Sequence, residues 1–115
     1  MAVAKTIVSM DEIKKVARQI VDKFRPQKVI LFGSYADGQP TEDSDVDLLI
    51  VMDADEQPVH TAARISAAIA HEFAIDILVF RPAELEASLQ RKGVFATEVM
   101  SKGIVLYEDR DDRVG

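Results

Sequence analysis

The sequence predicts a single domain of the mixed α/β (α+β) class. The chain has 115 residues, the length of one domain, and its 48% hydrophobic and 30% charged residues are typical of a globular protein. Short β-branched apolar runs predict strands, and segments with apolar residues three and four apart predict helices. The two kinds of segment are interspersed along the chain, which is the pattern of a sheet covered by helices.

The first predicted element is an amphipathic helix from about Met10 to Phe24. Ser9 and Glu12 form a capping-box pattern at its start, and Pro26 ends it. Apolar residues recur at intervals that place them on one face of the helix. This stripe consists of Ile13, Val16, Ala17, Ile20, Val21 and Phe24.

Two strands are predicted in the next part of the chain. The run "KVILF" (28–32) is short and rich in β-branched and aromatic residues, so it predicts a buried strand that ends at Gly33-Ser34. The residues "ADGQPTED" have the composition of a turn-rich loop. The run "DVDLLIVM" (45–52) predicts the second strand.

Helices dominate the remaining predictions. An alanine-rich segment (59–73) predicts a helix long enough to return the chain beside the second strand, and "IDILVF" (75–80) predicts a third strand there. Pro82 suits the first turn of a short helix (82–89), and Gly103 suits the C-terminal cap of another (94–102). "IVLYE" predicts a last strand, and residues from about 108 to 115 form a polar tail of the single domain, 1–115.

Composition restricts the class of function. The chain has no cysteine, which excludes disulfides and thiolate metal sites, and no apolar run approaches the ~18 residues of a membrane span. We therefore expect a cytoplasmic protein with no membrane partner. A net charge of −6 argues against a general nucleic-acid binder. Residues 1–32 nevertheless carry seven basic and three acidic residues, which suits an anionic ligand or acidic partner, or simply a solvated helix face.

Two acidic residues stand at the start of the second predicted strand. Asp45 and Asp47 are two residues apart, so their side chains project from the same face with backbones about 7 Å apart. Two such carboxylates raise each other's pKa unless a cation lies between them. Carboxylate oxygens are hard ligands that suit Mg²⁺ or Mn²⁺. The pattern predicts a divalent metal site, with a solvated turn as the alternative.

A third acidic residue interrupts the third predicted strand. Asp76 is surrounded by apolar residues in "IDILVF", where a carboxylate is costly to bury unless it is paired or bound to metal. If the second and third strands lie side by side, Asp45, Asp47 and Asp76 meet on one face. Three carboxylates are able to hold two divalent ions about 3.5–4 Å apart, as in-line phosphoryl displacement requires. An exposed strand end is the alternative interpretation of Asp76.

Gly33 and Ser34 supply groups that suit a phosphate. A glycine after a strand lets the backbone approach a ligand closely, and the serine adds a hydroxyl and an N–H. Alone, a Gly-Ser pair has almost no predictive value. Its value here comes from the ten residues that separate it from Asp45-x-Asp47.

This combination resembles the nucleotidyltransferases of the DNA polymerase beta superfamily, and most closely the minimal, antitoxin-like nucleotidyltransferase proteins. The resemblance covers about residues 10–107. It implies a small mixed β-sheet with helices mainly on one side. It also implies that Gly33 and Ser34 hold the triphosphate, that Asp45 and Asp47 bind two Mg²⁺ ions, and that Asp76 completes the metal site and helps to activate the acceptor hydroxyl.

The implied activity is Mg²⁺-dependent transfer of a nucleoside monophosphate, with ATP as the expected donor, to a hydroxyl group. Minimal nucleotidyltransferases are often paired with a helical HEPN-domain protein, so the resemblance implies such a partner or a homo-oligomer. An antitoxin-like subunit that neutralises its partner by contact is the alternative. Asp37 favours this alternative, because many family members carry Arg there. Four basic residues are candidates to compensate for that change: Lys5, Lys14, Lys15 and Arg18.

The length of the chain indicates that a second protein completes the site. The predicted elements use nearly all 115 residues, which leaves no second domain to hold an acceptor in line with the α-phosphate. Exposed apolar residues in the C-terminal third are the predicted contact surface, with packing inside the domain as the alternative. These residues are Leu85, Leu89, Val94 and Phe95.

Overall fold

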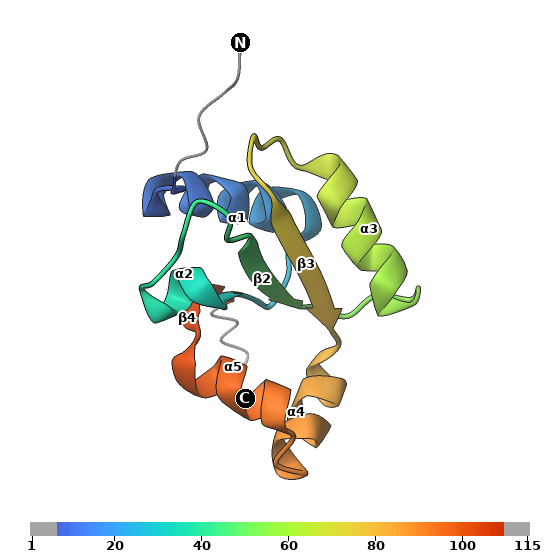
Figure 1. Ribbon diagram of the computed structural model, residues 1–115. Helices are drawn as coiled ribbons and strands as arrows, with labels where there is room; N and C mark the ends of the chain where they lie inside the picture. The colour runs from blue at the N-terminus through green and yellow to red at the C-terminus, as the bar shows by residue number, and fades with distance from the viewer. Residues whose placement is uncertain (1–6, 110–115) are drawn as a thin grey trace.

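The computed structural model describes residues 7–109, which form five helices and four strands (Figure 1). Residues 110–115 of the predicted tail lie outside the described residues, and Glu108 is the last residue of a strand. The elements in chain order are α1 (Met10–Phe24), β1 (Lys28–Phe32), α2 (Ser34–Asp37), β2 (Val46–Val51), α3 (Pro58–Ala68), β3 (Ile75–Phe80), α4 (Pro82–Gln90), α5 (Val94–Lys102) and β4 (Ile104–Glu108).

The four strands form one mixed sheet in the order β3-β2-β1-β4. β1 pairs in antiparallel fashion with β2 on one side and β4 on the other, while β2 and β3 are parallel. The parallel pair requires a crossover, and α3 provides it. The starts of β2 and β3 therefore lie at the same end of the sheet as the end of β1.

Helices cover both faces of the sheet. α1 and α3 pack on one face in the larger core cluster, whereas α4 and α5 pack on the other face in a smaller one, and Figure 1 shows the sheet between these two layers. Alternation along β2 divides its side chains between the layers: Leu48 and Ile50 contact the α1 layer, and Leu49 and Val51 contact the α5 layer.

Helix α1 begins as the sequence predicts. The Ser9 hydroxyl accepts a hydrogen bond from the Glu12 backbone N–H at 3.2 Å, and the Glu12 carboxylate accepts one from the Ser9 N–H at 3.4 Å. Ile13, Val16 and Ile20 of the predicted stripe are buried. The capping box thus fixes the start of α1, and the stripe fixes the face that it turns to the sheet.

Helix α3 is shorter than the predicted segment 59–73. It ends at Ala68, and side chains of α1 bind the chain beyond that point. The Lys23 ammonium donates to the Ala68 carbonyl at 2.6 Å, while the Gln19 amide donates to the Ala70 carbonyl and accepts from the Ala70 N–H. These contacts satisfy backbone groups at the end of the helix, so the chain leaves α3 early and reaches β3 through an irregular segment.

The predicted class is confirmed, with two additions. The short helix α2 follows Gly33 where only a loop is expected, and α4 and α5 form a second layer of helices in addition to the larger one. Within residues 7–109, no helix has the length and apolar character that crossing a membrane requires. The predicted strand boundaries agree with the structure to within one residue.

The second helical layer predicts a stability difference between two apolar residues of the expected contact surface. Leu85 is 6% exposed inside that layer, while Val94 is 82% exposed. Leu85→Ala should lower the free energy of unfolding by about 2–4 kcal/mol, because it leaves a cavity. Val94→Ala should change it by less than about 0.5 kcal/mol. Urea denaturation of both variants measures the difference, and equal losses would contradict the assignment of Leu85 to the core.

Candidate active site

The structure brings two acidic residues together at one end of the sheet. Asp47 in β2 is the register partner of Asp76 in β3, and on its other side it is the register partner of Phe32 in β1. Both carboxylates lie on the face that α4 and α5 cover, because their strand neighbours Leu48 and Ile77 face the α1 layer. The predicted convergence of Asp47 and Asp76 on one face is present.

Asp45 lies immediately before β2, at the end of the loop from α2, and its side chain is exposed. Local hydrogen bonds shape that loop: the Ser44 N–H donates to the Thr41 carbonyl at 3.0 Å, and the Thr41 N–H donates to the Ser44 hydroxyl at 2.9 Å. This turn delivers Asp45 to the mouth of the site, close enough for its charge to act on Asp47.

Electrostatics raise the pKa of Asp47 to about 6. Burial of the carboxylate is the largest cause, followed by the negative charges of Asp76 and Asp45 and by a side-chain hydrogen bond with Asp76. Each of these disfavours the ionised form. Near neutral pH, Asp47 is thus a carboxylate whose charge the surrounding residues do not compensate.

Gly33 holds a backbone conformation that leaves room for Asp47. Its φ of 79° lies in the region that favours glycine, and a Cβ atom added to it would overlap the Asp47 carboxylate. The sequence predicts that this glycine allows close approach of a ligand. In the structure, the group that approaches Gly33 is the carboxylate of Asp47.

Helix α2 is fixed to the core by Tyr35. The ring is buried, and its hydroxyl accepts a hydrogen bond from the Val8 N–H at 3.0 Å. The Gly33 carbonyl accepts from the N–H groups of Ala36 and Asp37, both at 3.0 Å. Ser34, at the first position of α2, is therefore held on a short turn whose base is packed.

A cleft of about 110 Å³ separates α2 from α5 beside Gly33. Asp37 lines it from α2, and Glu98 and Lys102 line it from α5, where they form an exposed ion pair of 3.8 Å. Phe95 closes one side, with its ring centroid 5.4 Å from that of Phe32. Sequence analysis did not find Lys102, because 65 residues separate it from Asp37; the helical face shared by Glu98 and Lys102 was the available signal.

The basic residues proposed to compensate for Asp37 lie elsewhere. Lys14, Lys15 and Arg18 belong to α1, which packs on the opposite face of the sheet from Asp47 and Asp76. Lys5 lies outside the described residues. In the part of the chain that the structure describes, the basic residue lining the cleft beside Asp37 is instead Lys102.

Asp45, Asp47 and Asp76 have the chemistry to bind a divalent cation, but their present arrangement is too open to hold one. Among residues 7–109, no three His, Cys, Asp or Glu side chains are grouped closely enough to hold a metal ion. Asp47 and Asp76 nevertheless face each other as hard oxygen donors, and Asp45 stands nearby. Burial of Asp47 and the repulsion from Asp76 and Asp45 both disfavour its ionised form, and a bound cation would offset this unfavourable energy.

Comparison with known families gives one match along most of the chain. The model described as "Polymerase beta, Nucleotidyltransferase" matches residues 12–112. Two similar proteins come from Methanocaldococcus jannaschii, and each is named "putative protein adenylyltransferase". One is 38% identical over 54 residues, 44% of this chain and 54% of the relative; the other is 51% identical over 45 residues, 37% and 45% respectively. The chain spans about half the length of the curated relatives it matches.

Solved structures share the fold. A "putative nucleotidyltransferase" from Sulfolobus solfataricus superimposes with a TM-score of 0.60 at 19% identity, over 88% of this chain and 81% of that one. A toxin–antitoxin structure with AMP-PNP gives a TM-score of 0.60 at 20% identity, over 90% and 77%. At these identities the likeness concerns the arrangement of helices and strands.

Two glycines with similar backbones allow a controlled test of the contact with Asp47. Gly33 and Gly38 have φ of 79° and 80°, but a Cβ at Gly38 would meet nothing within 4 Å. Gly38→Ala should lower the free energy of unfolding by about 1–2 kcal/mol through backbone strain alone. Gly33→Ala should lower it further, because the methyl group displaces Asp47. Thermal unfolding compares the two variants. Equal losses of stability would contradict the close contact between Gly33 and Asp47.

The raised pKa of Asp47 predicts how the stability of the metal-free protein depends on pH. The carboxyl ionises near pH 6 when folded and near 3.8 when unfolded, so its contribution is most favourable below pH 3.8 and is lost as the pH rises through 6. At pH 8, in chelator, Asp47→Asn should raise the free energy of unfolding by on the order of 1 kcal/mol, a value reduced for partial exposure. The gain should vanish near pH 4. Asp55→Asn, an exposed loop change, is the control.

Proposed function

The chain belongs to the polymerase beta nucleotidyltransferase family, and from this membership we propose that it transfers AMP from ATP to a hydroxyl group in a Mg²⁺-dependent reaction. The register of Asp47 with Asp76 on adjacent parallel strands is the observation that carries the proposal. Exposed carboxylates usually separate in order to lower their repulsion. Here the backbone ladder holds these two together, and a site that binds a cation explains why.

The residues have separate roles in this reaction. Asp45, Asp47 and Asp76 would hold Mg²⁺, with Mn²⁺ as a substitute, and such ions would supply positive charge to the phosphates. Gly33 and Ser34 bind the triphosphate through backbone N–H groups and the serine hydroxyl. Asp76, exposed at the edge of the site, accepts the proton of the acceptor hydroxyl.

Because ATP is the donor, the bonds that form and break are those at its α-phosphorus. The acceptor oxygen forms a bond to the α-phosphorus, and the bond from that phosphorus to the oxygen leading to the β-phosphate breaks. Pyrophosphate leaves, and AMP stays on the acceptor. Because positioning supplies much of the rate in this class of reaction, the fixed strand register of the carboxylates is the main contribution of the chain.

A protein acceptor is the substrate class that we favour. The two relatives from Methanocaldococcus jannaschii are each named "putative protein adenylyltransferase", and their aligned segments are 38% and 51% identical to this chain. An antitoxin role, in which a HEPN-type partner in the cytoplasm is adenylylated, extends this proposal on the basis of the family resemblance. Val94 and Phe95 on α5 are exposed apolar residues on the same side of the sheet as the acids, and they suit contact with such an acceptor.

A second candidate is a subunit that neutralises its partner by contact alone. Asp37 favours it, because this carboxylate and Glu98 place two negative charges in the cleft beside Gly33 against the single positive charge of Lys102. A triphosphate is repelled by that excess. Binding of labelled ATP with Mg²⁺ separates the two candidates, because only the enzyme requires the nucleotide.

Transfer of labelled AMP tests the proposed enzyme. The chain is incubated with α-labelled ATP, Mg²⁺ and its genomic neighbour, and label on protein is measured. Asp76→Asn should lower transfer by ~10²-fold or more while the fold persists, because it removes a metal ligand and a proton acceptor. Asp55→Asn, in the exposed loop that follows β2 at the opposite end of that strand from Asp47, should not change it. Full activity of Asp76→Asn would falsify its role, and ATP binding without transfer would favour the contact subunit.

A further inference from the structure

The last turn of α5 is fixed against the end of β1. Gly103 follows this turn, and a Cβ atom added to it would lie 2.7 Å from the Ile30 side chain and 3.1 Å from the Leu31 carbonyl oxygen. The Gly103 N–H donates to the Val99 carbonyl at 2.7 Å, and Val99 is buried in the core under α5. The backbone that carries Lys102 is therefore held in one place, while its side chain is exposed.

The strand register brings Lys102 to Gly33. β1 and β4 are antiparallel, and Leu31 is the register partner of Ile104. Continued by two residues, this register places position 102 beside Gly33. Lys102 and Gly33 line the same cleft, and the Asp47 carboxylate lies directly against Gly33. One glycine therefore separates the lysine from the nearer of the two facing carboxylates.

The order of the strands arranges these groups in a row. The sheet has the order β3-β2-β1-β4, and one end of it is formed by the starts of β3, β2 and β4 and by the end of β1. Along that end the residues follow one another as Asp76, Asp47, Gly33 and Lys102. The row thus begins with two carboxylates on the β3 side and ends with an ammonium group on the β4 side.

The Lys102 ammonium is free to change its partner. Its ion pair with Glu98 spans 3.8 Å, and the two side chains are 65% and 63% exposed. Exposed pairs of this kind stabilise a protein very little, because water competes for both charges. The flexible stem of a lysine lets its ammonium group bind a phosphate without a fixed geometry. A phosphate that enters the cleft therefore competes well with Glu98.

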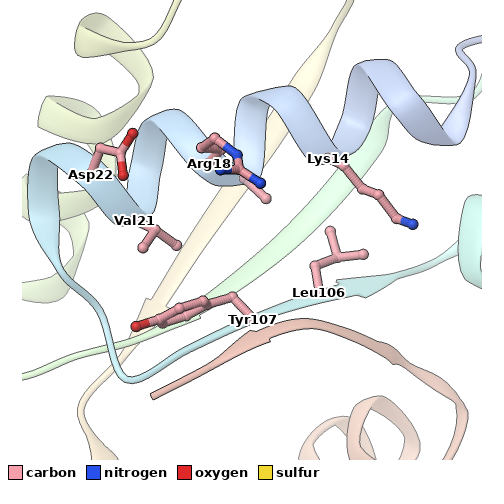
Figure 2. A pocket seen from close by; sticks show the side chains of 7 residues that line it. Lys14, Arg18, Val21, Asp22, Leu106 and Tyr107 are labelled. Carbon is pink, nitrogen blue, oxygen red and sulfur yellow. The ribbon is translucent and has the colours of Figure 1, made fainter. Parts of the chain in front are cut away.

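Other basic residues are placed or bound elsewhere. Of the residues that the structure describes, Lys102 is the one that supplies positive charge to this cleft. Lys14 and Arg18 line a hollow between α1 and β4, on the opposite face of the sheet (Figure 2). The Arg81 guanidinium donates to the Glu56 carbonyl at 2.9 Å, in the loop beyond the far end of β2.

On the basis of the proposed function, in which Gly33 and Ser34 bind the triphosphate, we propose that Lys102 binds its β- and γ-phosphates. The α-phosphate reacts beside Asp47 and Asp76, so the other two phosphates extend along the row toward Lys102. The ammonium leaves Glu98 when the nucleotide enters. Lys102 then determines the affinity for a triphosphate and stabilises the negative charge that develops on pyrophosphate as it leaves.

Isothermal titration calorimetry with ATP and Mg²⁺ tests the contact. Lys102→Gln should weaken ATP binding by on the order of ten-fold, because a charge-assisted hydrogen bond is lost. AMP lacks the β- and γ-phosphates, so it should bind to this variant and to wild type equally. Lys15→Gln, which removes the same charge from an exposed position on α1, should not change ATP binding. Both variants should keep the unfolding temperature of wild type, because both lysines are exposed.

The two carboxylates of the cleft provide tests in the opposite direction. Glu98→Gln should strengthen ATP binding by roughly two- to five-fold, because Lys102 loses its competing partner. Asp37→Arg places a second cation in the cleft. In that background, Lys102→Gln should weaken ATP binding less than it does in wild type, because the two cations share the phosphates. A purely structural role of Lys102 predicts neither result.

The outcomes separate this inference from the proposed function. If wild type binds ATP and Lys102→Gln binds it equally well, the role of Lys102 is wrong and the proposed function stands. An equal loss of ATP and AMP binding in Lys102→Gln would also overturn the contact with the β- and γ-phosphates. A wild type that does not bind ATP would contradict the proposed function, and the role of Lys102 with it.

Discussion

Repulsion between Asp47 and Asp76 is the constraint on which the arrangement of this molecule depends. The two residues are register partners on parallel strands, and burial, followed by the negative charges of Asp76 and Asp45, raises the pKa of Asp47 to about 6. Elements around them maintain this unfavourable contact. α3 packs on β3 and returns the chain parallel to β2. Gly33 has no side chain, which leaves room for the Asp47 carboxylate. The Thr41–Ser44 turn places Asp45 at the same end of the sheet. The carboxylate pair destabilises one end of the sheet, and apolar packing in the two cores offsets that loss of stability.

The two cores explain how a small domain tolerates that loss. β1 and β2 occupy the middle of the sheet, and their side chains are buried on both faces. Burial of an aliphatic side chain contributes about 1.5–3 kcal/mol, so a few such residues offset the repulsion of one carboxylate pair. The acidic residues stand at strand starts, where solvent reaches them, while the apolar residues continue along the strands. β2 and β3 thus each have an apolar part that stabilises the sheet and an acidic part that can bind a cation.

Local signals predict the elements and much of the site, whereas contacts between distant segments do not appear in the sequence pattern. Ser9 with Glu12 predicts the start of α1, and the period-two position of Asp47 and Asp76 predicts their shared face, because both patterns are set within a few residues. The early end of α3 depends on Lys23 and Gln19 of α1, which no local rule includes. Lys102 reaches the cleft for a similar reason: its position depends on how α5 packs on the sheet.

The placement of charge assigns different partners to different surfaces. The first 32 residues carry an excess of basic residues, yet those on α1 face away from the acidic site. They therefore do not serve a triphosphate held beside Gly33, and their use must be sought on the α1 face. There, Lys14, Arg18 and Asp22 border a hollow over Leu106 and Tyr107 of β4 (Figure 2). The exposed apolar residues of α5, Val94 and Phe95, are the surface from which we expect an acceptor to approach the carboxylates.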